Sequence, residues 1–91
     1  MIGIAMEELK DRLINGHEAE FVYKGCEYSF EMRIEDGKKV IDIWKCSEEP
    51  WCIANSVVEG TDGIDTLFKK RCFEGKSFYD IESEVIIETV F

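Results

Sequence analysis

The sequence is poor in the residues that active sites most often use. Its 91 residues include one His, His17, and one Pro, Pro50. General acid–base catalysis favours His because the charge of its side chain changes near neutral pH. His17 directly follows Asn15-Gly16, which is typical of an exposed turn. We therefore expect a protein without enzymatic activity, and no residue is assigned a catalytic role.

The chain has no cysteine spacing that is typical of a metal site. Cys26, Cys46, Cys52 and Cys72 are separated by 20, 6 and 20 positions, whereas paired zinc ligands are about two to four residues apart. The N-terminus shows neither a basic leader nor a long apolar run, so we expect a cytoplasmic protein with reduced thiols. Cys46 and Cys52 could still pair on oxidation. We expect no metal and no cofactor.

Long apolar runs and excess positive charge are also missing. A membrane-spanning helix needs about 20 apolar residues, and the longest apolar stretches here are several-fold shorter. Lys and Arg number 11 against 20 Asp and Glu, which gives a formal charge of -9. Direct binding to nucleic acid or to a membrane is therefore not expected, because phosphate contacts need basic side chains.

The composition is nevertheless that of a folded protein. Hydrophobic residues make up 45% of the chain and aromatic residues 12%, enough to build a core. A chain of 91 residues is expected to form a single domain over residues 1–91. We find no internal repeat and no linker in the sequence.

The first segment has the pattern of an amphipathic helix. Ile2, Met6, Leu9 and Leu13 follow one another at steps of four, three and four, with charged residues between them. Asn15-Gly16 then ends the pattern, since Gly adopts the left-handed conformation that closes a helix. The spacing predicts a helix over residues 3–15.

From residue 19 the period of the apolar residues changes to two, which predicts an antiparallel meander of three strands over residues 19–46. Turns are expected at Lys24-Gly25 and at Asp36-Gly37, the second being a preferred pair for a two-residue hairpin. The residue numbers of two positions that face each other across the second turn then add up to 73. This register puts Met32 opposite Ile41 on the core face.

The same register defines an opposite face of the sheet. Trp44 lies on that face together with Val40, and Glu31 lies opposite Asp42. Like charges that face each other are unfavourable unless water or a base lies between them, so this face should be solvated. Residues 51–58 look extended and predict a fourth strand.

The C-terminal half predicts further helices and a last strand. Asp62, with Asp65 three residues on, resembles a helix cap. The expected helix carries one apolar face and ends in three bases and a glycine; its residues are Ile64, Leu67, Phe68, Cys72, Lys69, Lys70, Arg71 and Gly75. Ser77 and Asp80 predict a second, short helix, and residues 84–91 a strand. The expected fold class is α+β, with an N-terminal helix, an antiparallel meander of three to four strands, one or two C-terminal helices and a final strand.

The expected partner-binding residues are aromatic, apolar or acidic residues on the third strand and in the segment that follows it. Tryptophan is enriched in binding hot spots, and an exposed indole on an acidic sheet would mark a partner surface. The alternative is that the segment around Pro50-Trp51 folds across this face and covers it. The residues concerned are Trp44, Val40, Trp51, Glu48 and Glu49.

The acidic charge suggests the kind of partner. Residues 46–91 hold 10 acids against 4 bases, and residues 46–68 and 77–91 hold no base at all. We expect a non-catalytic interaction module that docks on a basic protein. Two alternatives stay open: a nucleic-acid mimic, whose carboxylates would form one band, and a small homo-oligomeric or ligand-binding protein, such as a homodimer.

Two resemblances accompany these expectations. The stretches Met6-Glu-Glu-Leu-Lys10, Phe21-Val-Tyr-Lys-Gly25 and Gly75-Lys-Ser-Phe-Tyr-Asp-Ile81 resemble small acidic proteins of Gram-positive bacteria and their mobile elements. That likeness implies a bacterial protein and no particular activity. The expected element order and the charge are similar to those of some small anti-CRISPR inhibitors, which would fit the nucleic-acid mimic.

Overall fold

The first helix, α1, spans Met6–Ile14 and starts later than the predicted range of 3–15. Its apolar stripe is confirmed in part, because Leu9 and Leu13 are fully buried. Gly16 follows the helix with a φ of +88°, the left-handed conformation that glycine adopts without a Cβ clash. The sequence therefore located this helix and its C-terminal end.

The segment before α1 is not helical, which corrects the predicted helix start. Ile2 forms a parallel bridge with Ile86 instead of lying on the helical stripe. Its N–H donates to the carbonyl of Val85 over 3.0 Å, and its carbonyl accepts from the N–H of Ile87 over 2.8 Å. The open backbone groups of a strand edge thus find partners here, which the helical pattern could not anticipate.

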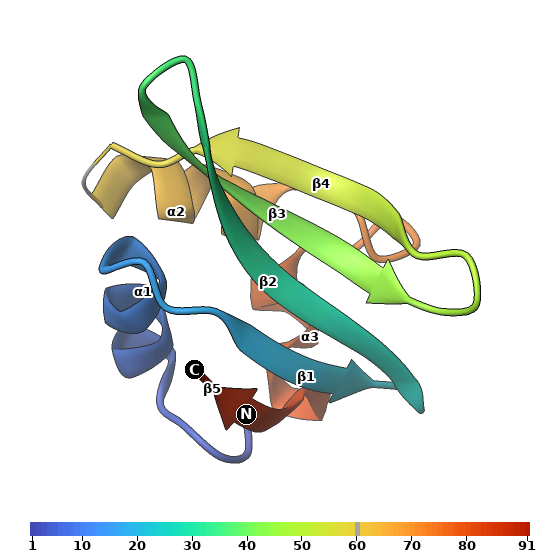
Figure 1. Cartoon of the computed structure of the whole chain (residues 1–91). Coiled ribbons are helices and arrows are strands. Elements are labelled where there is room, and N and C mark those ends of the chain that lie inside the picture. The colour runs from blue at the N-terminus through green and yellow to red at the C-terminus, as the bar shows by residue number, and fades with distance from the viewer. Residues whose placement is uncertain (60) are drawn as a thin grey trace.

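Five strands form one antiparallel sheet in the order β4-β3-β2-β1-β5 (Figure 1). The computed structural model describes residues 1–59 and 61–91. Both the predicted meander and the predicted fourth and final strands are confirmed. The strands are β1 (Ala19–Tyr23), β2 (Cys26–Glu35), β3 (Lys38–Cys46), β4 (Trp51–Val57) and β5 (Ile86–Val90).

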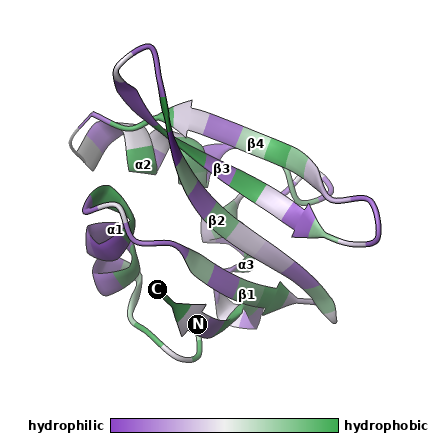
Figure 2. Cartoon of the chain, viewed as in Figure 1, coloured by the Kyte–Doolittle hydropathy of each residue, from purple (hydrophilic) through white to green (hydrophobic). Residues whose placement is uncertain are grey.

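The β2–β3 hairpin has the predicted turn and register. Asp36 and Gly37 have φ values of +51° and +75°, and this type of two-residue turn requires both to be positive. Met32 faces Ile41, and the residue numbers of every other facing pair of this hairpin also add up to 73. Figure 2 shows that β3 carries both hydrophobic and hydrophilic residues along its length.

The second helix, α2, spans Thr61–Lys69 and differs from the prediction at both ends. Asp62 lies within its first turn rather than before it. Cys72, predicted on the apolar face of this helix, lies beyond its end, where its N–H donates to the carbonyl of Lys70 over 3.0 Å. The chain turns here because Phe73 and the residues after it form a tight hairpin of their own.

The third helix, α3 (Phe78–Ile81), confirms the predicted cap. The N–H of Asp80 donates to Oγ of Ser77 over 3.1 Å, and the N–H of Ser77 donates to Oδ2 of Asp80 over 2.9 Å. This reciprocal pair satisfies two backbone donors that a helix start leaves free. A short 3₁₀ turn, η1 (Glu82–Glu84), leads from α3 to β5.

The core lies between the helices and one face of the sheet. Its centre is a group of phenylalanine rings that are fully buried. The Phe78 ring lies 4.6 Å from that of Phe68, 5.3 Å from that of Phe30 and 5.4 Å from that of Phe21, measured between centroids. Tilted and edge-on arrangements of this kind are favourable for aromatic rings. The short helix α3 is therefore held to the core by the ring of Phe78, together with the buried Ile81.

A polar network joins the three helices at the surface. Tyr79 donates its hydroxyl hydrogen to Asp65, and Nζ of Lys69 lies 2.8 Å from Oδ2 of the same carboxylate. The ammonium of Lys10 lies 4.8 Å from the centre of the Tyr79 ring. The hydrogen bonds from Lys69 and then Tyr79 lower the pKa of Asp65 below its ordinary value.

This network and the α3 cap predict a loss of stability in acid. Backbone and side-chain hydrogen bonds from Ser77 also lower the pKa of Asp80. Both folded-state pKa values lie below the ordinary value of 3.8. The two carboxylates therefore stabilise the folded protein above that pH, and this stabilisation is lost as the pH falls through the lowered pKa values. Urea unfolding at pH values from about 6 to about 2.5 should show this loss.

The matched variant carries Asp65→Asn together with Asp80→Asn. It should be less stable than the parent protein near pH 6, and its free energy of unfolding should fall less in acid. An acid-induced loss of the same size in both proteins would show that other carboxylates are responsible.

Candidate partner interface

In residues 1–59 and 61–91, one face of the sheet carries no helix, since the core and the helices lie on the other side (Figure 1). We call it the open face. On β3 this open face presents Val40, Asp42 and Trp44, which alternate with the buried Ile41 and Ile43. The register adds their neighbours on the adjacent strands, which point to the same side. These are Ser29, Glu31 and Arg33 on β2, and Cys52, Asn55 and Val57 on β4.

A charged pair at the centre of the open face resolves the predicted clash of carboxylates. Glu31 does face Asp42, but Nε of Arg33 donates to Oδ2 of Asp42 over 2.9 Å. Arg33 also pairs with Glu35 through Nη1, and Glu31 accepts from the hydroxyl of Ser29 over 2.7 Å. A base intervenes, and Asp42 is only 4% exposed. The expectation of a fully solvated face is therefore wrong at Asp42.

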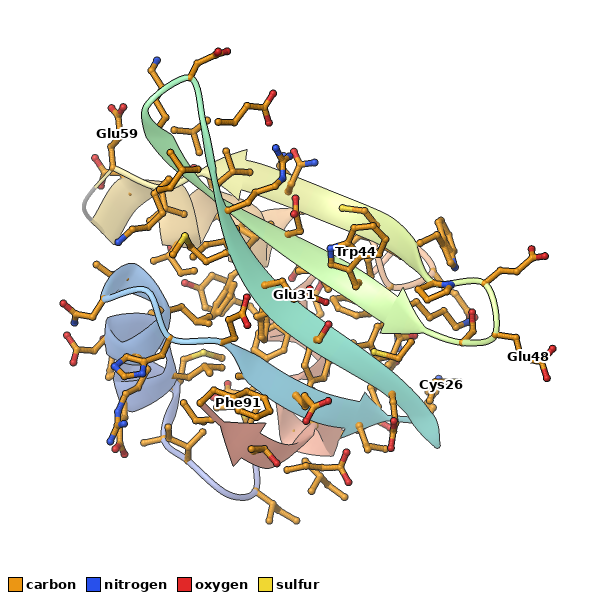
Figure 3. All side chains as sticks on the ribbon, viewed as in Figure 1. Cys26, Glu31, Trp44, Glu48, Glu59 and Phe91 are labelled. Carbon is orange, nitrogen blue, oxygen red and sulfur yellow. The ribbon has the colours of Figure 1, made fainter. Side chains whose placement is uncertain are left out.

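Trp44 is the largest side chain on the open face. It is half-buried, and within residues 1–59 and 61–91 its indole N–H has no hydrogen-bond partner. Figure 3 shows Trp44 on β3 close to Glu31 on β2. On β1, Glu20 lies opposite Ser29, the residue that also faces Trp44. An indole with a free donor thus lies among carboxylates.

The other predicted partner-binding residues do not all gather around Trp44. Val40 shares its face but is only 5% exposed. Glu48 and Glu49 are exposed in the β3–β4 turn, and Figure 3 shows Glu48 at the end of that hairpin. Trp51, in β4, does not fold across the open face. It pairs with Lys45 of β3, which puts its side chain on the helix side of the sheet.

Sequence reasoning missed an apolar row on the open face. Val22 on β1 lies opposite Ile86 on β5, and Ile86 in turn pairs with Ile2. Ile86 is 44% exposed and Ile2 66% exposed. The sequence signal existed, because Val22 alternates with core residues, but assigning Ile2 to a helix hid it. The open face thus combines the indole of Trp44, an aliphatic end and carboxylates.

Both edges of the sheet are partly covered. Lys70 donates to the carbonyl of Asn55 on the outer edge of β4, and Ile2 covers part of β5. Edge strands without such cover tend to pair with other chains. Lys70 belongs to the basic triplet 69–71. The side chains of this triplet do not point to one common site, since Lys70 contacts Asn55 and Lys69 pairs with Asp65. The structure therefore favours the helix-end interpretation of this triplet.

The exposed carboxylates are spread over several parts of the surface. Glu7 and Glu8 lie on α1 beside Lys10 and Arg12, with which they pair. Others lie at the tips of both long hairpins, along η1 and on β5. In the described parts of the chain they do not form the single band that nucleic-acid mimicry would require.

The residues considered for chemistry lie apart. His17 is exposed, and its ring contacts the backbone oxygen of Phe91. The four cysteines are free thiols, of which Cys46 is exposed and Cys52 is half-buried beside Asp42. Within residues 1–59 and 61–91, no group of three His, Cys, Asp or Glu side chains could hold a metal ion. None of the helices in the same residues is long and apolar enough to cross a membrane.

Comparisons of this chain with known proteins identified no relative. No family model matches the chain, and the searches of curated proteins and of solved structures found no match.

Proposed function

We propose that this protein is a non-catalytic binding domain that docks on a basic partner protein through the open face of its sheet. The observation that carries the proposal is Trp44, a half-buried indole with an unpaired donor on a face that no helix covers. Large aromatic side chains in such positions are the usual anchors of protein interfaces.

The charge around this anchor supports a basic partner. Glu20 and Glu31 share the open face with Trp44, and Glu27 is exposed on the same side of β2. Among the described residues, only Arg33 brings a positive charge to the centre of this face, and it is paired with Asp42. Carboxylates at an interface rim mainly speed association and select the partner. A cytoplasmic location belongs to the same proposal, and the four free thiols favour it.

The test is affinity capture of the partner from cells that produce the protein, followed by measured binding of the purified partner. Trp44→Ala should weaken binding by about 30-fold or more, since removing a hot-spot aromatic costs at least about 2 kcal/mol. Trp51→Ala is the matched control, because Trp51 lies on the other side of the sheet. Equal losses in both variants, or none in Trp44→Ala, would contradict the proposal.

Charge reversal tests the acidic character of the same face. Glu31→Lys should slow association with a basic partner and reduce the salt dependence of binding. Glu84→Lys, an exposed site on η1, serves as its control. If the captured protein is a second copy of this chain, a concentration-dependent mass in sedimentation will show it, and the docking proposal will give way to self-association.

A further inference from the structure

A pocket lies on the helix side of the sheet, at the end where the β1–β2 and β3–β4 hairpins turn. Its volume is about 230 Å³, below the roughly 300–1,000 Å³ of typical drug-sized sites. Four aromatic side chains and two charged ones line most of it, and we call it the aromatic pocket. They are Tyr23, Tyr28, Trp51, Phe73, Lys45 and Glu74.

The walls of the aromatic pocket are held in place by the fold. The Phe73 ring lies edge-on to Tyr28 at 5.3 Å and to Tyr23 at 5.9 Å between centroids. Phe73 and Lys76 exchange backbone hydrogen bonds of 2.9 and 3.1 Å, which close a tight turn. A site whose walls are already ordered loses little conformational entropy when a ligand binds.

Trp51 leaves one wall open to solvent. Its side chain is 57% exposed, although Tyr23, Tyr28 and Phe73 in the same pocket are buried. An exposed indole face next to buried rings offers a stacking surface for another planar group. Nothing in the described residues covers this face.

The polar groups of the pocket are unpaired. Within residues 1–59 and 61–91, neither Lys45 nor Glu74 has an oppositely charged group within 4 Å, and the phenols of Tyr23 and Tyr28 have no protein hydrogen-bond partner. Burial raises the pKa of Tyr28, so this phenol stays a neutral donor at physiological pH. The pocket thus presents one cation, one anion and two hydroxyls around an aromatic hollow.

We propose that the aromatic pocket binds a free aromatic α-amino acid. Its ring would lie against the exposed face of Trp51 and over the outer edges of the buried rings, its carboxylate would face Lys45, and its ammonium would face Glu74. A ligand with a carboxylate alone would leave Glu74 as a repelling charge, and an amine alone would be repelled by Lys45. Only a zwitterion matches both charges, and the small volume restricts it to one or two rings.

The binding experiment uses Trp51 as its reporter. The chain has two tryptophans, so Trp44→Phe leaves Trp51 as the only indole, and this variant is titrated with L-phenylalanine. We expect a saturable change of fluorescence with a Kd in the millimolar range, as is usual for a ligand of this size, about −4 kcal/mol. The probes 3-phenylpropanoate, which lacks the ammonium, and phenethylamine, which lacks the carboxylate, should each bind about tenfold more weakly.

Two variants assign the charges. Lys45→Met removes the cation, so it should weaken binding of the two ligands that carry a carboxylate, L-phenylalanine and 3-phenylpropanoate, but not of phenethylamine. Glu74→Gln removes the anion, so it should weaken binding of the two ligands that carry an ammonium, L-phenylalanine and phenethylamine, but not of 3-phenylpropanoate. Lys76→Met, an exposed cation on the same turn, is the matched control and should change none of them. Absence of saturation at tens of millimolar, or equal affinities for the three probes, would overturn the proposal. Partner capture through Trp44 is a separate measurement, so either proposal can fail alone.

Discussion

A Phe78→Ala variant is expected to lose about 3–5 kcal/mol of unfolding free energy. Phe78 is fully buried and lies within aromatic contact of Phe21, Phe30 and Phe68. Removing its ring leaves a cavity at the centre of the core, and it also removes the main apolar anchor of α3. Small domains are stable by only about 5–15 kcal/mol, so this loss is a large part of the total.

Urea unfolding followed by circular dichroism measures the effect. Phe91→Ala is the matched control, because Phe91 is 64% exposed, and its loss should stay within about 0.5 kcal/mol. If the two substitutions cost the same, the packing described for Phe78 does not stabilise the protein. If Phe78→Ala does not fold, Phe78→Leu provides a milder version of the same test.

The second large effect is expected from Gly63→Ala. In an exposed helix this change would add about 0.5–1 kcal/mol of stability. Here α2 packs closely on β4: a Cβ on Gly63 would lie 2.6 Å from Cα of Val58 and would overlap the carbonyl oxygen of Val57. Both obstacles are backbone atoms that cannot rotate away. We expect a loss of about 2 kcal/mol or more, because the helix must move from the strand.

The control for Gly63→Ala is Thr66→Ala, at an exposed site on the same helix. It should change the free energy of unfolding by no more than about 0.5 kcal/mol. A stabilised Gly63→Ala protein would mean that α2 does not approach β4 as closely as described. The sign of the change, measured by chemical unfolding, therefore decides the question.

Local rules were sufficient for most of the fold. Asp36-Gly37 fixed a two-residue turn, and the alternation on either side of it then fixed the whole β2–β3 register, since a slip by one residue would turn Ile41 and Ile43 away from the core. Ser77 and Asp80 predicted the start of α3 for a similar reason: a helix cap involves only residues a few positions apart.

The errors occurred where a distant part of the chain intervened. Ile2 fits a helical stripe, yet it pairs with Ile86 at the far end of the sequence. Cys72 also fits a helical face, but the chain turns before it because Phe73 packs against Tyr23 and Tyr28. Neither contact has a signal in the neighbouring residues.

The candidate sites likewise depend partly on local rules and partly on contacts between distant parts of the chain. Register alone placed Trp44 on the face opposite the core, because side chains alternate along a strand. It did not show that Arg33 would neutralise Asp42 and leave it buried, nor that Ile2 would extend the apolar row. The aromatic pocket was not anticipated, since its walls come from four strands and a loop.

The sequence by itself determined the α+β class, the strands and their turns, the acidic charge and the face that carries Trp44. These depend on periodicity and on turn chemistry, which act over a few residues. Only the tertiary structure decided that β5 lies beside β1, that Trp44 and Trp51 lie on opposite sides of the sheet, and that Lys45 and Glu74 flank one pocket. Such arrangements depend on how distant segments pack together, and packing follows from the shape of the whole core.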